Sequence, residues 1–134
     1  MKRILLALCL LGAFLNARAF AALGDDESKV ENLFGKPAKE GVADNRGVTT
    51  NLYEKGDYAI LVQFLNHLSL AESYARIDQH ELSQKEIDAF LEGSSNGRLW
   101  IKDADKLAWE RSDSKAKAWC TTVRDHPTLL IEAQ

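Results

Sequence analysis

Apolar residues recur at helical spacing in one short segment near the start of the chain. Val30, Leu33 and Phe34 fall at positions i, i+3 and i+4, which places them on one edge of a helix. Asp26 is suited to cap the first turn, and Gly35 can end the helix in a left-handed conformation. The pattern therefore predicts a short amphipathic helix between these two residues.

A second helix is predicted after residue 82. Ser83-Gln84-Lys85-Glu86 has the spacing of a capping box, in which the serine and the glutamate each bond the other's backbone. Ile87, Phe90 and Leu91 form its apolar edge, and Gly93 is expected to stop it. Each helix has only one narrow apolar edge, so each should lie on a sheet.

The other segments alternate apolar and polar residues, as β-strands do. Three strands precede the second helix and four follow it, and polar turns separate the strands within each group. The chain thus reads α-βββ-α-ββββ, an α+β fold with two short helices on one face of an antiparallel sheet, and its two helix-plus-strand units suggest a degenerate tandem repeat. The predicted strands are residues 48–54, 58–65, 68–76, 98–102, 107–112, 115–123 and 128–133.

Strand 58–65 is apolar on both faces. Ile60 and Val62 point to one side, and Leu61 and Leu65 point to the other. A strand of this kind is covered on both sides, so we expect it inside the sheet, with Ile60 and Val62 under the helices.

The alternation also predicts a binding surface on the face away from the helices. If Leu99, Ile101 and the small row Ala116-x-Ala118-x-Cys120 point inward, a set of aromatic and basic side chains points outward, on the side of the sheet to which Leu61 and Leu65 also point. The alternatives are that loops, the chain terminus or a second subunit cover this set, or that a bulge reverses one strand. Trp109 shares a face with both Leu107 and Arg111 and is expected in the core. The predicted partner-binding residues are Trp100, Lys102, Lys117 and Trp119.

The first 21 residues have the features of a secretory signal peptide. Lys2 and Arg3 precede an apolar stretch over 4–15, and small residues offer cleavage after Ala19 or Ala21. The stretch is too short to span a bilayer, and Leu8 before Cys9 argues against lipoprotein processing. A buried N-terminal helix or a membrane anchor is the alternative. We therefore expect a secreted or periplasmic protein, residues 22–134 forming one domain without stable membrane insertion.

Removal of the leader changes the charge and the cysteine count. The 134-residue chain has 17 basic and 20 acidic side chains. Loss of Lys2, Arg3 and Arg18 leaves 14 basic against 20 acidic groups, which argues against nucleic-acid binding. Cys120 then stands alone, so no internal disulfide can form. We expect it to be buried as a small apolar residue; a reactive thiol or a covalent dimer link is the alternative.

Motifs for catalysis, metals or cofactors are not evident. His67, His80 and His126 share no metal-ligand spacing, and Asp103-Ala104-Asp105 lacks the oxygen ligand and glycine that a calcium loop needs next. A carboxylate pair assembled by the fold, for instance from Glu72 and Glu110, stays open. We expect no cofactor and no metal.

One stretch resembles a known family. Val30–Pro37 reads V-E-N-L-F-G-K-P and is followed by Leu52-Tyr53 and then by Val62-x-Phe64. This order is similar to the helix, Gly-x-Pro and meander of outer-membrane assembly lipoproteins of the SmpA/OmlA type, over residues 26–76. The resemblance implies an exported bacterial protein that binds other proteins. The lipid-anchored cysteine of that group is missing here, so a membrane tether is not implied.

Two classes of function follow. The first is an exported, non-catalytic binding or scaffolding module that holds an envelope or secreted protein, a peptide or a glycan on its uncovered sheet face. The second is a small extracytoplasmic enzyme whose carboxylates and a histidine such as His80 are brought together by the fold.

Overall fold

The computed structural model describes residues 23–134, so the predicted signal peptide lies outside the described residues. The described chain has two helices and one seven-stranded antiparallel sheet, and the predicted order α-βββ-α-ββββ is confirmed. The elements are α2 (Glu27–Phe34), β1 (Thr49–Lys55), β2 (Tyr58–Leu65), β3 (Leu68–Arg76), α3 (Gln84–Gly93), β4 (Trp100–Lys102), β5 (Ala108–Arg111), β6 (Ala116–Val123) and β7 (His126–Ala133).

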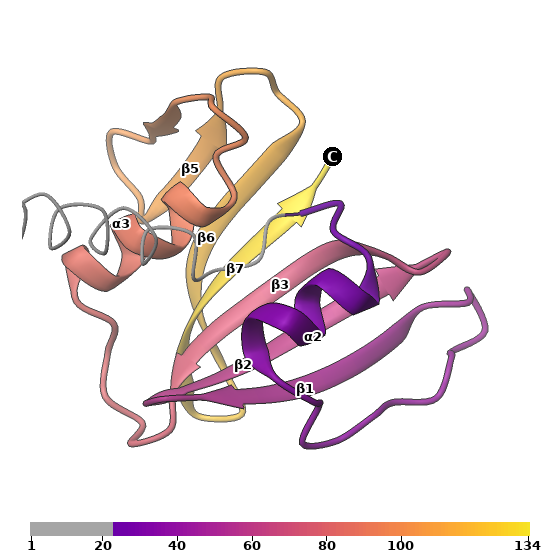
Figure 1. Ribbon diagram of the computed structural model, residues 1–134. Coiled ribbons are helices and arrows are strands. Elements are labelled where there is room, and N and C mark those ends of the chain that lie inside the picture. Colours follow the sequence, from indigo (N-terminus) through magenta and orange to yellow (C-terminus); the bar gives the residue numbers. More distant parts are fainter. Residues whose placement is uncertain (1–22) are drawn as a thin grey trace, which may run out of the picture.

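Two meanders join edge to edge to make the sheet. The strand order is β1-β2-β3-β7-β6-β5-β4, so the last strand of each meander pairs with the other at the centre. In that central pair Tyr74 lies opposite Leu129 and Glu72 lies opposite Ile131. Figure 1 shows α2 across β1–β3, and α3 beside the second meander. Both helices contribute to one core on the same side of the sheet.

Tight turns close two of the hairpins. Asn66 and His67 have φ angles of 52° and 65°, and Arg124 and Asp125 have φ angles of 48° and 66°. Two successive left-handed residues match the twist of the strands they connect. The tight second turn explains one error of prediction: β7 begins at His126 and so includes Pro127, which was expected to precede the strand. A proline near the first residue of a strand is tolerated.

Both N-caps and the glycine end of α2 form as predicted, whereas α3 continues through Gly93, which was expected to stop it. Asp26 Oδ1 accepts a hydrogen bond of 2.8 Å from the Lys29 amide, and Gly35 ends α2 with a φ of 84°. Ser83 Oγ accepts from the Glu86 amide at 3.1 Å, and Glu86 Oε1 accepts from the Ser83 amide at 2.9 Å. The helix runs to Gly93, and Ser94 is its C-cap.

Aromatic rings hold the helices on the sheet. Phe90 of α3 stacks on Tyr74 at a centroid distance of 4.2 Å and meets Tyr58 edge-on at 5.1 Å. Phe34 of α2 contacts Tyr53 at 5.8 Å. Ile60, Val62 and Trp109 belong to the same buried cluster, as the alternation predicted. The full cluster is Val30, Phe34, Tyr53, Ile60, Val62, Phe64, Tyr74, Ile87, Phe90, Leu91, Trp109, Ala118, Leu129 and Ile131.

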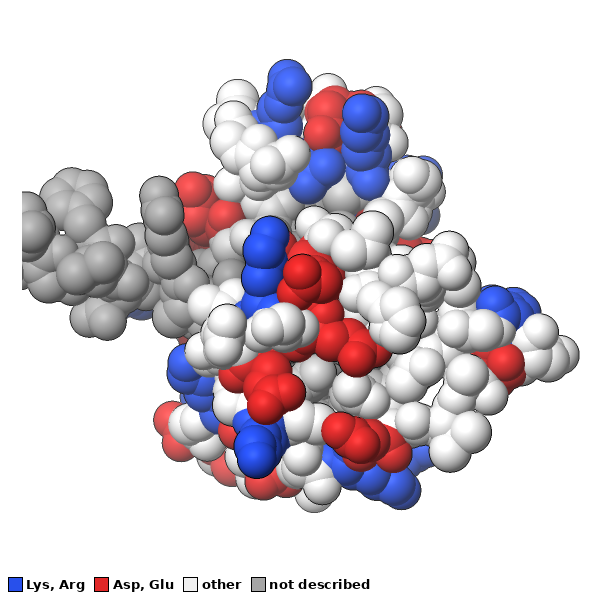
Figure 2. All heavy atoms as spheres, turned by 45° about the vertical axis from the view of Figure 1, so that its right-hand side comes forward, with Lys and Arg blue, Asp and Glu red and all other residues white. Residues whose placement is uncertain are grey.

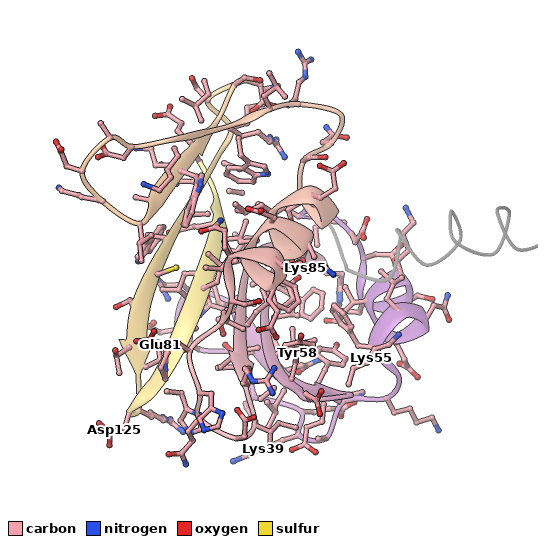
Figure 3. The ribbon with its side chains drawn as sticks, turned by 90° about the vertical axis from the view of Figure 1, so that its left-hand side faces the viewer. Lys39, Lys55, Tyr58, Glu81, Lys85 and Asp125 are labelled. Atoms are coloured by element: carbon pink, nitrogen blue, oxygen red, sulfur yellow. The ribbon has the colours of Figure 1, made fainter. Side chains whose placement is uncertain are left out.

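Glu86 connects the start of α3 to two strands. Its Oε2 accepts a hydrogen bond from the Tyr58 hydroxyl, and Arg76 Nη1 lies 3.0 Å from the same oxygen. Tyr58 lies between the sheet and α3 (Figure 3). Burial opposes ionisation of Glu86, but hydrogen bonds from Ser83, Tyr58 and Arg76 prevail and lower its pKa to about 2. This carboxylate therefore stays charged and fixes the angle of α3 on the sheet.

We predict that Glu86→Gln lowers the free energy of unfolding by about 1–3 kcal/mol at pH 7, because charge-assisted hydrogen bonds to Arg76 and Tyr58 are weakened. The folded pKa lies below the ordinary value of 4.5, so this stabilisation is present above pH 4.5 and disappears as the pH falls toward 2. Urea unfolding at pH 7 and at pH 3 measures both effects. Glu81→Gln, at an exposed position, is the control. Equal losses for the two variants would contradict the role given to Glu86.

Candidate functional site

The strand register places an apolar row across the face of the sheet opposite the helices. Residues paired directly across antiparallel strands point to the same side, so the row can be read from the pairing. It crosses six neighbouring strands in the order β1, β2, β3, β7, β6 and β5, with one residue from each: Leu52, Leu61, Ser73, Leu130, Trp119 and Ala108. Leu61 is 37% exposed, and Trp119 and Leu130 are half-buried. No helix of the described chain covers this row, which we call the open-face row.

A more polar row runs beside it. It consists of Thr50, Gln63, Ala71, Glu132, Lys117, Glu110 and Ile101. Lys117 is paired with Glu132 on one side and with Glu110 on the other. These opposite charges on neighbouring strands stabilise the pairing. On the other flank of the open-face row lie the small side chains of Ala75 and two threonines, Thr128 and Thr121.

The open-face row leads into a groove of about 210 Å³. Leu61, Leu130 and Val123 supply its apolar walls, whereas Thr50, Gln63 and Ser73 supply hydroxyl and amide groups. Glu72 also lines it, but the alternation of β3 turns its side chain toward the core. The groove therefore offers an uncharged side-chain lining with a few hydrogen-bonding groups, as sites for apolar side chains of a partner do.

The predicted binding set does not share one face, so that part of the prediction is wrong. Lys117 and Trp119 lie on the open face, as expected. Trp100 pairs with Arg111 and Lys102 pairs with Trp109, which puts both on the helix side. The residues expected in the core, Leu99 and Ile101, are 77% and 61% exposed.

A hydrogen bond explains the reversal in β4. Trp100 packs against the core, and its indole Nε1 donates to the Leu91 carbonyl at 2.7 Å, near the end of α3. Even half-buried, a tryptophan removes more apolar area from water than Leu99 or Ile101 would, and it supplies a donor to the helix terminus. Local alternation cannot show this, because the acceptor comes from the preceding helix.

Cys120 lies on the helix side of β6, as predicted, but is half-buried. It lines a second hollow of about 270 Å³, formed by the segment before α3 and the β6–β7 hairpin. Figure 3 shows Glu81 and Asp125 on these two segments. Burial raises the pKa of the thiol, so Cys120 is un-ionised at neutral pH and a poor nucleophile.

The catalytic groups considered from the sequence are not brought together. Glu72 points into the core and Glu110 lies on the open face, so they form no pair. The His80 side chain is 80% exposed, and its Nδ1 lies 3.5 Å from the Asp78 carboxylate at the surface. Asp103 accepts the amides of Asp105 and Lys106 and forms a turn. Residues 23–134 contain no cluster of three or more groups that could hold a metal ion.

Glu72 is the one strongly perturbed carboxyl group in the described core. It is 1% exposed, and the Tyr74 hydroxyl donates to its Oε2 at 2.5 Å. Its Oε1 has no hydrogen-bond partner in that core. Burial raises the pKa of Glu72 to about 8, against the opposing effect of the Tyr74 hydrogen bond. At neutral pH the group is therefore mostly a neutral acid.

Comparison with known proteins finds no matching family model and no match among curated proteins. Three bacterial structures resemble the fold. A cysteine-rich secretory protein from Staphylococcus aureus matches 84% of this chain and 44% of its own, at 11% identity and a TM-score of 0.49. The DUF4309 family protein YjgB from Bacillus subtilis matches 82% of this chain and 79% of its own, at 15% identity and a TM-score of 0.46. An extracellular protein containing an SCP domain from Bacillus anthracis matches 84% of this chain and 44% of its own, at 10% identity and a TM-score of 0.43.

This chain spans less than half the length of the first and third of these proteins. Two of the three are described as secretory or extracellular. The comparisons give no support to the resemblance to SmpA/OmlA-type lipoproteins. Among the described residues, no helix is long and apolar enough to cross a membrane.

Replacing each tryptophan by phenylalanine should separate their roles. We predict that Trp100→Phe lowers the free energy of unfolding by about 1–3 kcal/mol, because the Leu91 carbonyl loses one of its two donors and the core loses contacts. Trp119→Phe, at the open face, should change it by less than about 0.5 kcal/mol. Denaturant unfolding monitored by circular dichroism measures both. Equal effects would contradict the structural role given to the indole hydrogen bond and core packing of Trp100.

We predict that Glu72→Gln changes the pH dependence of stability. The folded pKa of about 8 lies above the ordinary 4.5, so the native protein loses stability as the pH rises from 4.5 to 8. Glutamine does not titrate. The free energy of unfolding of the variant, relative to that of the native protein, should therefore be about 3 kcal/mol higher at pH 7 than at pH 4. Thermal unfolding across this range tests it. If the difference in stability between the two proteins does not change with pH, the pKa of Glu72 is not raised.

Proposed function

We propose that this chain is an exported, non-catalytic binding module whose partner docks on the open-face row. The signal-peptide pattern at the start of the sequence supports export. The observation that supports the docking surface is the apolar row from Leu61 to Trp119, which no described helix covers and which ends in a groove. Exposed apolar surface bordered by polar residues is typical of partner sites.

The row has the layout of a protein-binding surface. Trp119 and Leu130 provide a partly buried apolar centre, and Lys117 with its two glutamates provides a charged rim. Aromatic residues at the centre and charges at the rim are the usual arrangement of an interface. The groove beside Leu61 can receive one apolar side chain of the partner, so we assign the partner to the exported or envelope proteins rather than to small metabolites.

The enzyme alternative has less support. His80 is exposed and meets only Asp78 among the described acids, so the geometry offers no enclosed histidine–carboxylate site. Glu72 has a raised pKa, but its side chain is directed into the core and Tyr74 occupies one of its oxygens. A substrate would have to displace core residues to reach it.

We predict that Leu61→Lys abolishes partner binding while leaving the fold intact, because a charge in the apolar groove must be desolvated on docking. The purified protein is cross-linked to envelope and secreted fractions of its host, and captured proteins are compared between variants by mass spectrometry. Val42→Lys, which adds the same charge at a position that is 93% exposed and away from the groove lining, is the matched control.

A protein captured by the native chain and by Val42→Lys, but lost with Leu61→Lys and with Trp119→Ala, supports the proposal. Thermal unfolding of each variant shows whether the fold is retained. Capture that is unaffected by both open-face changes would overturn it.

A further inference from the structure

The outer edge of β4 carries backbone groups that no strand of the described chain pairs. The Asp103 amide donates to Ala108 and the Ser112 amide donates to Leu99, each at 2.8 Å. Bonded pairs alternate along an antiparallel ladder, so residues 99, 101 and 103 bond toward β5. The amides and carbonyls of Trp100 and Lys102 therefore point outward, where β4 is the last strand of the sheet.

Side chains along this edge alternate in character. Leu99 and Ile101 project from the open face and are largely exposed. Lys102 projects from the helix side and is also exposed. An extended segment paired with β4 would thus meet apolar side chains on one face and a positive charge on the other.

The edge also lies in the most basic part of the chain. Residues 98–117 carry six basic and four acidic side chains, whereas the rest of the described chain carries eight basic and sixteen acidic ones. Figure 2 shows several Lys and Arg side chains, with acidic atoms among them, at the end of the molecule where Figure 1 places β5, and many Asp and Glu side chains over its middle. Over residues 98–106 the basic residues Arg98, Lys102 and Lys106 outnumber the acids Asp103 and Asp105, so an acidic strand is attracted and a basic one is repelled.

We propose that β4 binds an extended peptide segment of a partner protein, with alternating acidic and apolar residues, as an eighth strand of the sheet. Backbone hydrogen bonds to Trp100 and Lys102 hold the segment, as in β-strand addition. Its acidic side chains lie against Lys102, and its apolar side chains lie against Leu99 and Ile101. This surface is separate from the open-face row, and the proposal does not depend on it.

A second copy of the chain fits this edge less well. Pairing of two β4 strands would bring Arg98, Lys102 and Lys106 of both copies to one seam, where like charges repel. The strand has three residues, so the pair would bury far less than the roughly 1,200 Å² of a stable interface. Exposed lysines and short length are also the features by which edge strands avoid self-pairing.

A synthetic peptide of alternating valine and glutamate, blocked at both ends, tests the proposal by titration into the isotope-labelled protein. We expect amide shifts at residues 99–102 and no saturable shifts with the matching valine–lysine peptide. N-methylation of the peptide at every second residue, on the side that faces β4, should weaken binding at least tenfold, because each methyl removes one donor. N-methylation of the other residues should not.

Two variants at one position separate charge from backbone. Lys102→Glu should weaken binding of the valine–glutamate peptide about tenfold and allow the valine–lysine peptide to bind. Lys102→Pro should abolish binding of both peptides, since it removes an outward amide without disturbing the pairing with β5. Unchanged amide shifts at β7 and α3 verify the fold of each variant.

Shifts confined to the open-face row, shifts at β4 that depend on protein concentration without peptide, or equal binding of the two peptides would each overturn the proposal. Docking at the open-face row is tested separately, with the Leu61 and Trp119 variants.

Discussion

The stacking of Phe90 on Tyr74 fixes α3 over the junction of the two meanders, and much of the remaining structure follows from it. With the helix in that place, its C-terminal carbonyls receive donors from the second meander. Trp100 donates to the Leu91 carbonyl, and Arg111 Nη1 donates to the Ser94 carbonyl at 2.9 Å. These bonds add side-chain donors to the backbone bonds that cap α3, and they turn both side chains toward the end of the helix. The opposite side of β4 and β5 is thereby left to face outward.

The fold could be predicted from the sequence where the signals were local. The capping box at Ser83, the glycine at position 35 and the two apolar faces of β2 each depend on residues within a few positions of one another. Strand β4 could not be placed in the same way. Its face depends on the indole bond to Leu91, and three residues give too short an alternation to decide between Trp100 and its neighbours.

The binding surface, too, was predicted where local signals decide it and missed where distant contacts decide it. Trp119 and Lys117 were placed correctly because β6 is long and its inward row consists of small residues, which can pack close under the helices. Leu61 and Trp119 were expected on the same face, but the continuous row that joins them and its groove were not evident from the sequence, since they require the pairing of β3 with β7. That pair joins segments more than fifty residues apart, and no local pattern specifies which two strands meet at the centre. Leu130 and Leu61 come onto one row only through it.

Burial of Glu72 couples folding to the solvent through a proton. The unfolded chain at pH 6 to 7 holds this side chain ionised, whereas the native chain holds it neutral, so nearly one hydrogen ion is taken up for each molecule that folds. The heat measured on unfolding therefore contains the ionisation enthalpy of whatever buffer accepts that hydrogen ion. Calorimetry in phosphate and in Tris should give different apparent enthalpies for the same cooperative transition, although the structure that melts is identical.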